Sequence, residues 1–187
     1  GRYIQHKTLL GHLNFVSAVC VLPPTSAYAF GLIATGSHDS TIRVYEPDSA
    51  DPVLIFTGHE GAVTCLNPAL NTCLLSASWD KTVKLWNTSL NECSMSFEGH
   101  LMAVWCVIQI PNGLIISGSA DHKIRVFNKN SSLKGILEGH TDCVRGLCHI
   151  SETIVLSCSN DSSVRRWDIE RGECMEILYS HPNYIYR

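Results

Sequence analysis

One dipeptide, Gly-His, recurs along this chain at a nearly constant interval, and this repeat constrains the fold more than any other feature. It occupies positions 11–12, 58–59, 99–100 and 139–140, and a degenerate Ser-His stands at 180–181. Successive histidines are 47, 41, 40 and 41 residues apart. Each of the first four is followed by an aspartate and, six residues later, an aromatic side chain: Asp39 and Tyr45, Asp80 and Trp86, Asp121 and Phe127, Asp161 and Trp167. Four copies with fixed internal spacing indicate repeated structural units.

Within a repeat, the apolar residues alternate with a period of two. In the segment 82–86, Val83 and Leu85 fall on one side of an extended chain and Lys84 on the other. Continuous apolar runs at 114–116 and 154–156 are typical of strands buried on both faces. We find no convincing amphipathic helix. The sequence therefore predicts an all-β fold in which each period of ~40–45 residues forms a four-stranded blade of a β-propeller.

Composition excludes several classes of function. The chain has a net charge of −3, so no strongly basic field favours nucleic acid, and no apolar run is long enough for a membrane span. Its nine cysteines form no CxxC motif and no Cys/His cluster with the spacing of a zinc site, so we expect no metal and no cofactor. Most of them lie in apolar stretches, which indicates free thiols in a reducing compartment, the cytoplasm and nucleus.

The Gly-His pair, the turn aspartate and a closing Trp-Asp at 167–168 resemble WD repeats. This resemblance implies a buried hydrogen-bond network in each repeat, made by the histidine, a strand hydroxyl, the aspartate and the tryptophan. The expected sets are His12, Asp39 and Tyr45; His59, Ser76, Asp80 and Trp86; His100, Ser117 and Asp121; and His140, Ser157, Asp161 and Trp167, with Thr35 as the hydroxyl of the first. Phe127 has no polar hydrogen, so we expect the third network to be incomplete there.

Sets of Ser, His and Asp also raise the possibility of a hydrolase. A catalytic triad, however, occurs once in a protein and lies in a cleft. A constellation repeated in every blade is expected to have the same architectural role each time. We therefore predict that the chain is not an enzyme.

The repeat positions predict the domain organisation, a partial WD-repeat propeller over 1–187. Residues 1–10 are expected to form the outer strand of a preceding blade, residues 11–57, 58–98, 99–138 and 139–180 successive repeats, and 181–187 the start of another. WD-type propellers usually close with about seven blades, so this chain is expected to be part of a larger propeller. Its first and last blades should then expose apolar faces and favour oligomerisation.

A binding surface is expected at the rim where the loops before the turn aspartates meet the loops after the Gly-His pairs. The candidate rim residues are Phe15, Ser17, His38, Thr64, Trp79, Trp105, Arg145, Asn160, Tyr184 and Tyr186. Trp, Tyr and Arg are the types enriched at interface hot spots. In the alternative interpretation, Trp79 or Trp105 fills the central channel.

Two further patterns are open to two interpretations. A basic residue follows each turn aspartate by four positions, at Arg43, Lys84, Arg125 and Arg165. These residues could form a functional stripe, although a solvated strand face is the simpler interpretation. The first repeat also has a longer segment, 22–31, predicted to form a loop opposite the rim that either makes a contact or simply packs.

Several segments together resemble the N-terminal propeller of the phospholipase A-2-activating protein family: 14–17, 31–36, 78–80, 139–147, 156–161, 164–167, 172–174 and 181–186. The resemblance implies an adaptor in ubiquitin-dependent protein degradation and sorting. The propeller would bind ubiquitin, and domains not in this chain would bind a ubiquitin-selective AAA unfoldase. Alternatives are a general WD scaffold or a ligase substrate receptor that binds a short peptide, an enzyme, and a structural coat protein.

Overall fold

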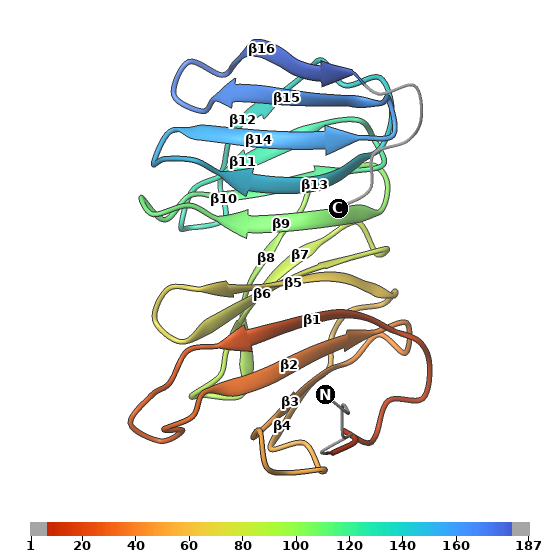
Figure 1. The fold of residues 1–187 in the computed structure, drawn as a ribbon, viewed down its shortest axis with the longest axis vertical. Helices are drawn as coiled ribbons and strands as arrows, with labels where there is room; N and C mark the ends of the chain where they lie inside the picture. Colours follow the sequence, from red (N-terminus) through yellow and green to blue (C-terminus); the bar gives the residue numbers. More distant parts are fainter. Residues whose placement is uncertain (1–6, 181–187) are drawn as a thin grey trace, which may run out of the picture.

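The computed structural model describes residues 7–180, which form four antiparallel four-stranded sheets stacked along the longest axis of the molecule (Figure 1). The fold is therefore all-β with four propeller-type blades, as predicted. The first sheet contains β1 (Val16–Leu22), β2 (Leu32–Ser37), β3 (Ile42–Tyr45) and β4 (Leu54–Phe56); the second β5 (Val63–Ala69), β6 (Cys73–Ser78), β7 (Val83–Asn87) and β8 (Glu92–Phe97); the third β9 (Val104–Gln109), β10 (Ile115–Ser119), β11 (Ile124–Phe127) and β12 (Leu133–Leu137); and the fourth β13 (Val144–His149), β14 (Ile154–Ser159), β15 (Ser163–Asp168) and β16 (Glu173–Ser180).

Each sheet is a meander in which consecutive strands pair with one another. The first strands of the sheets, β1, β5, β9 and β13, lie against one another in order along the stack. Short connections between the second and third strands bring each turn aspartate to the end of the sheet where the Gly-His pairs lie. The residue after each aspartate has a positive φ of 68–74°, at Ser40, Lys81, His122 and Ser162. The four turns therefore share one backbone conformation.

Each first strand has an irregularity at the same repeat position. In β1 the pairing with β2 passes from Val16 directly to Ala18, which leaves Ser17 without a partner in the register. The pairings skip Thr64 in β5, Trp105 in β9 and Arg145 in β13 in the same way. These residues are β-bulges, and a bulge changes the direction in which a side chain points.

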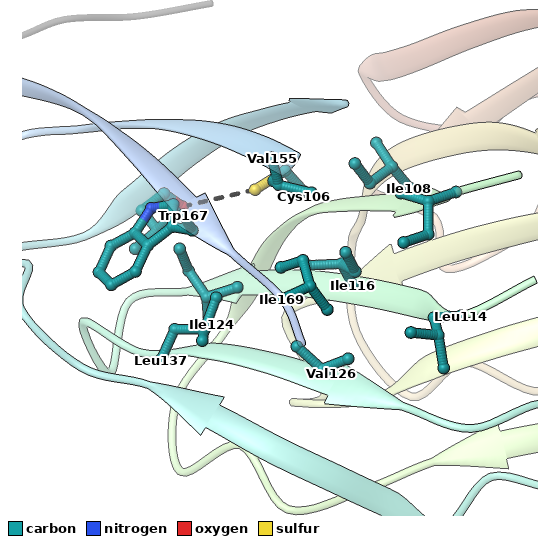
Figure 2. Close-up of a cluster of buried hydrophobic side chains, with 12 residues drawn as sticks. Cys106, Ile108, Leu114, Ile116, Ile124, Val126, Leu137, Val155, Trp167 and Ile169 are labelled. Carbon is teal, nitrogen blue, oxygen red and sulfur yellow. Dashed lines mark hydrogen bonds between the residues drawn. The ribbon is translucent and has the colours of Figure 1, made fainter. Parts of the chain in front are cut away.

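The hydrophobic core is divided into three clusters, one between each pair of neighbouring sheets. Phe56 of the first sheet packs against Trp86 of the second, with ring centroids 5.2 Å apart, and Phe97 of the second packs against Phe127 of the third at 5.4 Å. Between the third and fourth sheets, Trp167 packs with Leu137 and other aliphatic side chains (Figure 2). The aromatic that closes the third strand of the second, third and fourth sheets therefore packs against the preceding sheet.

The two segments that flank β1 differ in how they meet the sequence expectations. The outer strand predicted over 1–10 is not seen in its described part, because residues 7–10 form no strand; instead the Leu10 N–H donates to the Ala50 carbonyl at 3.0 Å. The long segment 22–31 connects β1 to β2 and lies at the end of the sheet opposite the turn aspartates. Tyr28 packs against the first core cluster and Phe30 is exposed.

Candidate functional site

Every repeat places its histidine, hydroxyl and aspartate in one hydrogen-bonded set. Histidine Nδ1 lies 2.6–2.9 Å from the aspartate Oδ2, and Nε2 lies 2.6–2.8 Å from the hydroxyl oxygen. In the second and fourth repeats the tryptophan Nε1–H donates to the same serine oxygen, from Trp86 to Ser76 at 2.8 Å and from Trp167 to Ser157 at 2.7 Å. The first repeat differs, because the Tyr45 hydroxyl donates to the Leu10 carbonyl at 2.8 Å.

The aspartates join the Gly-His loop to the turn. In the second repeat, Asp80 Oδ2 accepts the backbone N–H of Glu60 at 3.0 Å and Oδ1 accepts that of Thr82 at 2.9 Å. Burial alone would raise the pKa of this carboxyl, but hydrogen bonds from His59 and Thr82 outweigh burial and hold the pKa below its usual range. The same balance lowers the pKa of Asp161 to about 2.

The histidines of the last two sets favour the neutral state. Burial lowers the pKa of His100 and of His140, and it outweighs the opposite effect of the neighbouring Asp121 and Asp161. The serines bonded in these two sets, Ser117 and Ser157, are buried, and so is Ser76 of the second set. A set that occurs four times and buries its hydroxyl ties loops together and exposes no nucleophile to a substrate.

The third set lacks the tryptophan donor to the serine oxygen, as expected from Phe127, but it contains a contact that the other sets do not have. Arg125 Nη1 lies 2.8 Å from Asp121 Oδ2 and 2.6 Å from His100 Nδ1, and so contacts the two groups that the hydroxyls of Thr82 and Ser163 contact in the second and fourth sets. Arg125 is buried, and the interpretation of the basic residues as a solvated strand face is therefore wrong for this position. Arg43, Lys84 and Arg165 are half-buried, and Arg43 and Arg165 lie against Gly11 and Gly139.

The bulged residues divide into two kinds. The Ser17 hydroxyl donates to the carbonyl of Val63 in the next sheet, and the Thr64 hydroxyl donates to that of Val104 at 2.6 Å. These two hydroxyls link neighbouring sheets. Thr64 is buried by this contact, so it does not belong to an exposed rim as the sequence analysis proposed. The equivalent positions in the third and fourth sheets hold Trp105 and Arg145.

Trp105 and Arg145 extend a continuous row of ring contacts across all four sheets. The ring centroids of Phe15 and His38 lie 5.9 Å apart, those of His38 and Trp79 5.1 Å, and those of Trp79 and Trp105 6.3 Å. Arg145 Cζ then lies 4.1 Å from the Trp105 ring centroid. We call these five residues, together with Asn160, the ring arc. Asn160 belongs to it because its Oδ1 accepts a hydrogen bond from Arg145 Nε at 3.2 Å.

Backbone hydrogen bonds position the ring arc. The residue before each turn aspartate donates its N–H to the carbonyl three residues after the histidine, as from His38 to Phe15 and from Trp79 to Ala62, each at 2.9 Å. Phe15 is 77% exposed and Trp79 48% exposed. A rigid row of partly exposed aromatic side chains with a cation at one end is suited to recognition of another protein.

The structure unites six of the ten proposed rim residues. Thr64 is buried in a link between sheets, Ser17 is exposed and also links two sheets, and Tyr184 and Tyr186 lie outside the described residues. Leu13, Leu101 and Met102, which the sequence patterns did not indicate, are also exposed in the Gly-His loops. Leu13 and Leu101 directly follow a repeat histidine, and this position was the available signal, because their backbone N–H groups point inward to an aspartate.

Residues 7–180 contain no cluster of three or more His, Cys, Asp or Glu side chains suited to a metal ion. No helix in this described part of the chain is long and apolar enough to cross a membrane.

Comparison with known proteins adds three findings. The family model "WD domain, G-beta repeat" matches residues 4–46, 50–87, 91–128 and 131–168. The chain is 48% identical over 77 residues to phospholipase A-2-activating protein of Xenopus laevis and 43% identical over 176 residues to ubiquitin homeostasis protein lub1 of Schizosaccharomyces pombe. These matches cover 41% and 94% of this chain, but only 10% and 24% of the two relatives.

A solved structure, the WD40 β-propeller domain of Doa1, superimposes with a TM-score of 0.80 at 25% identity. The match covers 92% of this chain and 57% of that one. The resemblance to the phospholipase A-2-activating protein group is therefore confirmed by sequence and by fold.

Proposed function

Because the chain belongs to the family of WD domains with G-beta repeats, we propose that it is a non-catalytic interaction module that binds ubiquitin through the ring arc. The single observation that carries this proposal is the unbroken series of contacts from Phe15 to Arg145 across four sheets. The name of one relative, ubiquitin homeostasis protein lub1, supports the choice of partner.

The chemistry of the ring arc suits this partner. Ubiquitin presents a modest apolar patch that is ringed by basic side chains. The exposed rings of Phe15 and Trp79 can cover such a patch, and Glu60, an exposed carboxylate in the loop whose Gly61 lies against Trp79, can face its basic rim. A single patch of this size makes an interface at the low end of the usual range, so we expect weak binding by this module alone.

The wider role that we propose is that of an adaptor in ubiquitin-dependent degradation and sorting, in the cytoplasm and nucleus. Weak ubiquitin binding would gain strength if further modules bound ubiquitin or a ubiquitin-selective AAA unfoldase at the same time. The relatives are several times longer than this chain, which leaves room for such modules in them.

The experiment is a titration of isotope-labelled ubiquitin with this chain, followed by NMR chemical shifts. We expect shifts confined to the apolar patch, and about tenfold weaker binding for Trp79→Ala, since tryptophans are common hot spots. Phe30→Ala is the control, because this ring is more exposed than that of Trp79 but lies at the opposite end of the first sheet. Absence of shifts with the unmodified chain would exclude ubiquitin as the partner, and the ligase-receptor alternative would then be tested with short peptides.

A further inference from the structure

The partners of a buried imidazole determine which of its two ring nitrogens carries the proton. A neutral imidazole donates one hydrogen bond and accepts one, a carboxylate only accepts, and a guanidinium or an indole N–H only donates. The second, third and fourth sets give the histidine different partners, so their tautomers can be compared from the distances.

In the second set the proton lies on Nδ1. His59 Nδ1 is 2.6 Å from Asp80 Oδ2, and this oxygen has two lone pairs, of which the Glu60 N–H uses one. At the other end of the ring, the Ser76 oxygen accepts the Trp86 Nε1–H at 2.8 Å and has its own hydrogen to donate to His59 Nε2 at 2.6 Å. The fourth set has the same arrangement, made by His140, Asp161, Thr141, Ser157 and Trp167.

The third set has a different partner at Nδ1. His100 Nδ1 lies 2.6 Å from Arg125 Nη1 and 2.9 Å from Asp121 Oδ2. A guanidinium has no acceptor, so at 2.6 Å the imidazole nitrogen supplies the lone pair. The two lone pairs of Asp121 Oδ2 are used by the N–H groups of Leu101, at 3.0 Å, and of Arg125, at 2.8 Å. The proton of His100 is therefore on Nε2.

The other end of the His100 ring agrees with this assignment. Phe127 stands where the second and fourth repeats have tryptophan, so the Ser117 oxygen receives no indole N–H from that position. This oxygen can therefore accept the Nε2–H of His100 at 2.8 Å. The missing indole at one end of the ring and the guanidinium at the other favour the same tautomer.

Several charged and titratable groups surround this ring. They are Asp121 of the turn, Arg125 of β11, the ion pair of Lys123 with Glu138, and the Cys143 thiol of the following sheet. Burial raises the pKa of Cys143 to about 11, so this thiol stays neutral, and His122 of the same turn is exposed to solvent. Burial lowers the pKa of His100 itself, so this ring takes up a proton only below pH 6.5.

A second proton has different consequences in the two tautomers. In the second and fourth sets it adds to Nε2, where the serine can turn its hydroxyl and accept the new N–H, and the bond from Nδ1 to the aspartate stays in place. In the third set it adds to Nδ1 of His100, which then faces Arg125 as donor against donor and charge against like charge. Both groups compete for Asp121 Oδ2, whose two lone pairs are already used.

We propose that the third set is a pH-dependent switch, in which a proton taken up at His100 Nδ1 breaks the hydrogen bonds at Asp121 and opens the third Gly-His loop, residues 99–103. This loop carries the exposed side chains of Leu101 and Met102. Acid therefore changes the surface of the third repeat before that of the second and fourth. The switch resides in this set alone and does not depend on which partner the chain binds.

The first test is the tautomer itself, measured by long-range ¹H–¹⁵N NMR spectra of the isotope-labelled chain at about pH 7.5. The ¹⁵N chemical shift distinguishes a ring nitrogen that carries a proton from one that does not. We expect the proton on Nε2 for His100 and on Nδ1 for His59 and His140. A proton on Nδ1 of His100 would overturn the proposal, and this measurement requires no substitution.

The second test is hydrogen exchange at about pH 7.5 and about pH 5.5, with the rates corrected for the intrinsic effect of pH. The Leu101 amide donates to the turn aspartate, and the equivalent amides of Glu60 and Thr141 are matched controls within the same chain. We expect the protection of the Leu101 amide to fall about tenfold more on acidification than that of the two controls. Equal changes at the three amides would show that acid acts on all sets alike and would contradict the switch.

Arg125→Met removes the guanidinium and keeps a long side chain. The Asp121 oxygen then has an unused lone pair, so we expect the His100 proton to move to Nδ1 and the additional acid sensitivity of the third loop to disappear. Arg165→Met is the control at the same position of the fourth repeat, where the arginine forms no ion pair with its turn aspartate within the described residues. It should leave the tautomer of His140 unchanged. An Nε2 proton retained on His100 in Arg125→Met would show that the guanidinium does not set the tautomer and would also overturn the proposal.

Discussion

In each repeat, one buried histidine holds the Gly-His loop against a strand and its turn. An imidazole and a carboxylate can be buried together only if their hydrogen-bonding groups are satisfied. Here His140 meets Asp161 at 2.6 Å and Ser157 at 2.6 Å, and the Asp161 carboxylate also accepts two backbone N–H groups. This set therefore joins the Gly-His loop to a strand and turn that follow 17–21 residues later in the fourth repeat.

This arrangement predicts a loss of stability in acid. Burial lowers the pKa of His100 and His140 below 6.5, and hydrogen bonds lower that of Asp161 from 3.8 to about 2. The unfolded chain therefore binds protons that the folded chain does not, first as the pH falls below 6.5 and again below 3.8. We expect the free energy of unfolding to decline in these two ranges, as measured by urea unfolding at a series of pH values.

His140→Gln serves as the control for the pH dependence, because a glutamine side chain does not titrate. It should weaken the dependence near pH 6.5 and leave the decline below 3.8 in place. An equal free energy of unfolding at about pH 7.5 and about pH 5.5 in the unmodified chain would contradict the assignment of neutral histidines.

The ion pair between Arg125 and Asp121 could not be predicted from the sequence. The repeat position of Arg125 holds a basic residue in every copy, so the sequence offers no signal that distinguishes it from Arg43 or Arg165. The structure does, because Arg125 alone of these three forms an ion pair with its turn aspartate within the described residues. The third repeat has Lys123 where the other repeats have Thr41, Thr82 and Ser163, whose hydroxyls contact the aspartate and the histidine, and Arg125 makes these contacts instead.

At the scale of strands, the bulge determines which side chains reach the surface. Strict alternation along β9 would set the direction of the Trp105 side chain from the directions of its neighbours in the strand. The β-bulge at Trp105 changes that direction. The repeat spacing correctly grouped Ser17, Thr64, Trp105 and Arg145 as equivalent positions. Alternation alone could not show that the first two link sheets and the last two join the ring arc.

The third and fourth sheets pack too closely at Gly118 to accept a larger residue. A Cβ atom at Gly118 of β10 would lie 2.6 Å from Val144 Cγ1 of the next sheet and 2.7 Å from Cys106 Sγ. Gly118→Ala is therefore expected to lower the free energy of unfolding by about 1–3 kcal/mol through overpacking. Gly135→Ala is the matched control in the same sheet, since no atom lies within 4 Å of its Cβ position. Equal effects of the two substitutions on thermal unfolding would contradict this account of the interface.

At the scale of the whole molecule, the fold could be predicted because each repeat carries the same spacing pattern and so predicts the same blade independently. Four copies of one spacing pattern agree, so an error in any one copy is corrected by the others. The ring arc could be predicted only as a set of neighbouring loops. Its continuity depends on distances between sheets, such as the 6.3 Å between Trp79 and Trp105, and residues from different repeats carry no sequence signal of such a distance.

The central claim is that the bulge position links sheets in the first two repeats and recognises a partner in the last two. The most direct measurement compares ubiquitin affinity with thermal stability in Trp105→Thr. Threonine at this bulge can donate to the Val144 carbonyl, as Thr64 donates to that of Val104 at 2.6 Å. We predict an unfolding temperature close to that of the unmodified chain and about tenfold weaker ubiquitin binding. Unchanged ubiquitin binding together with a loss of stability would contradict the claim.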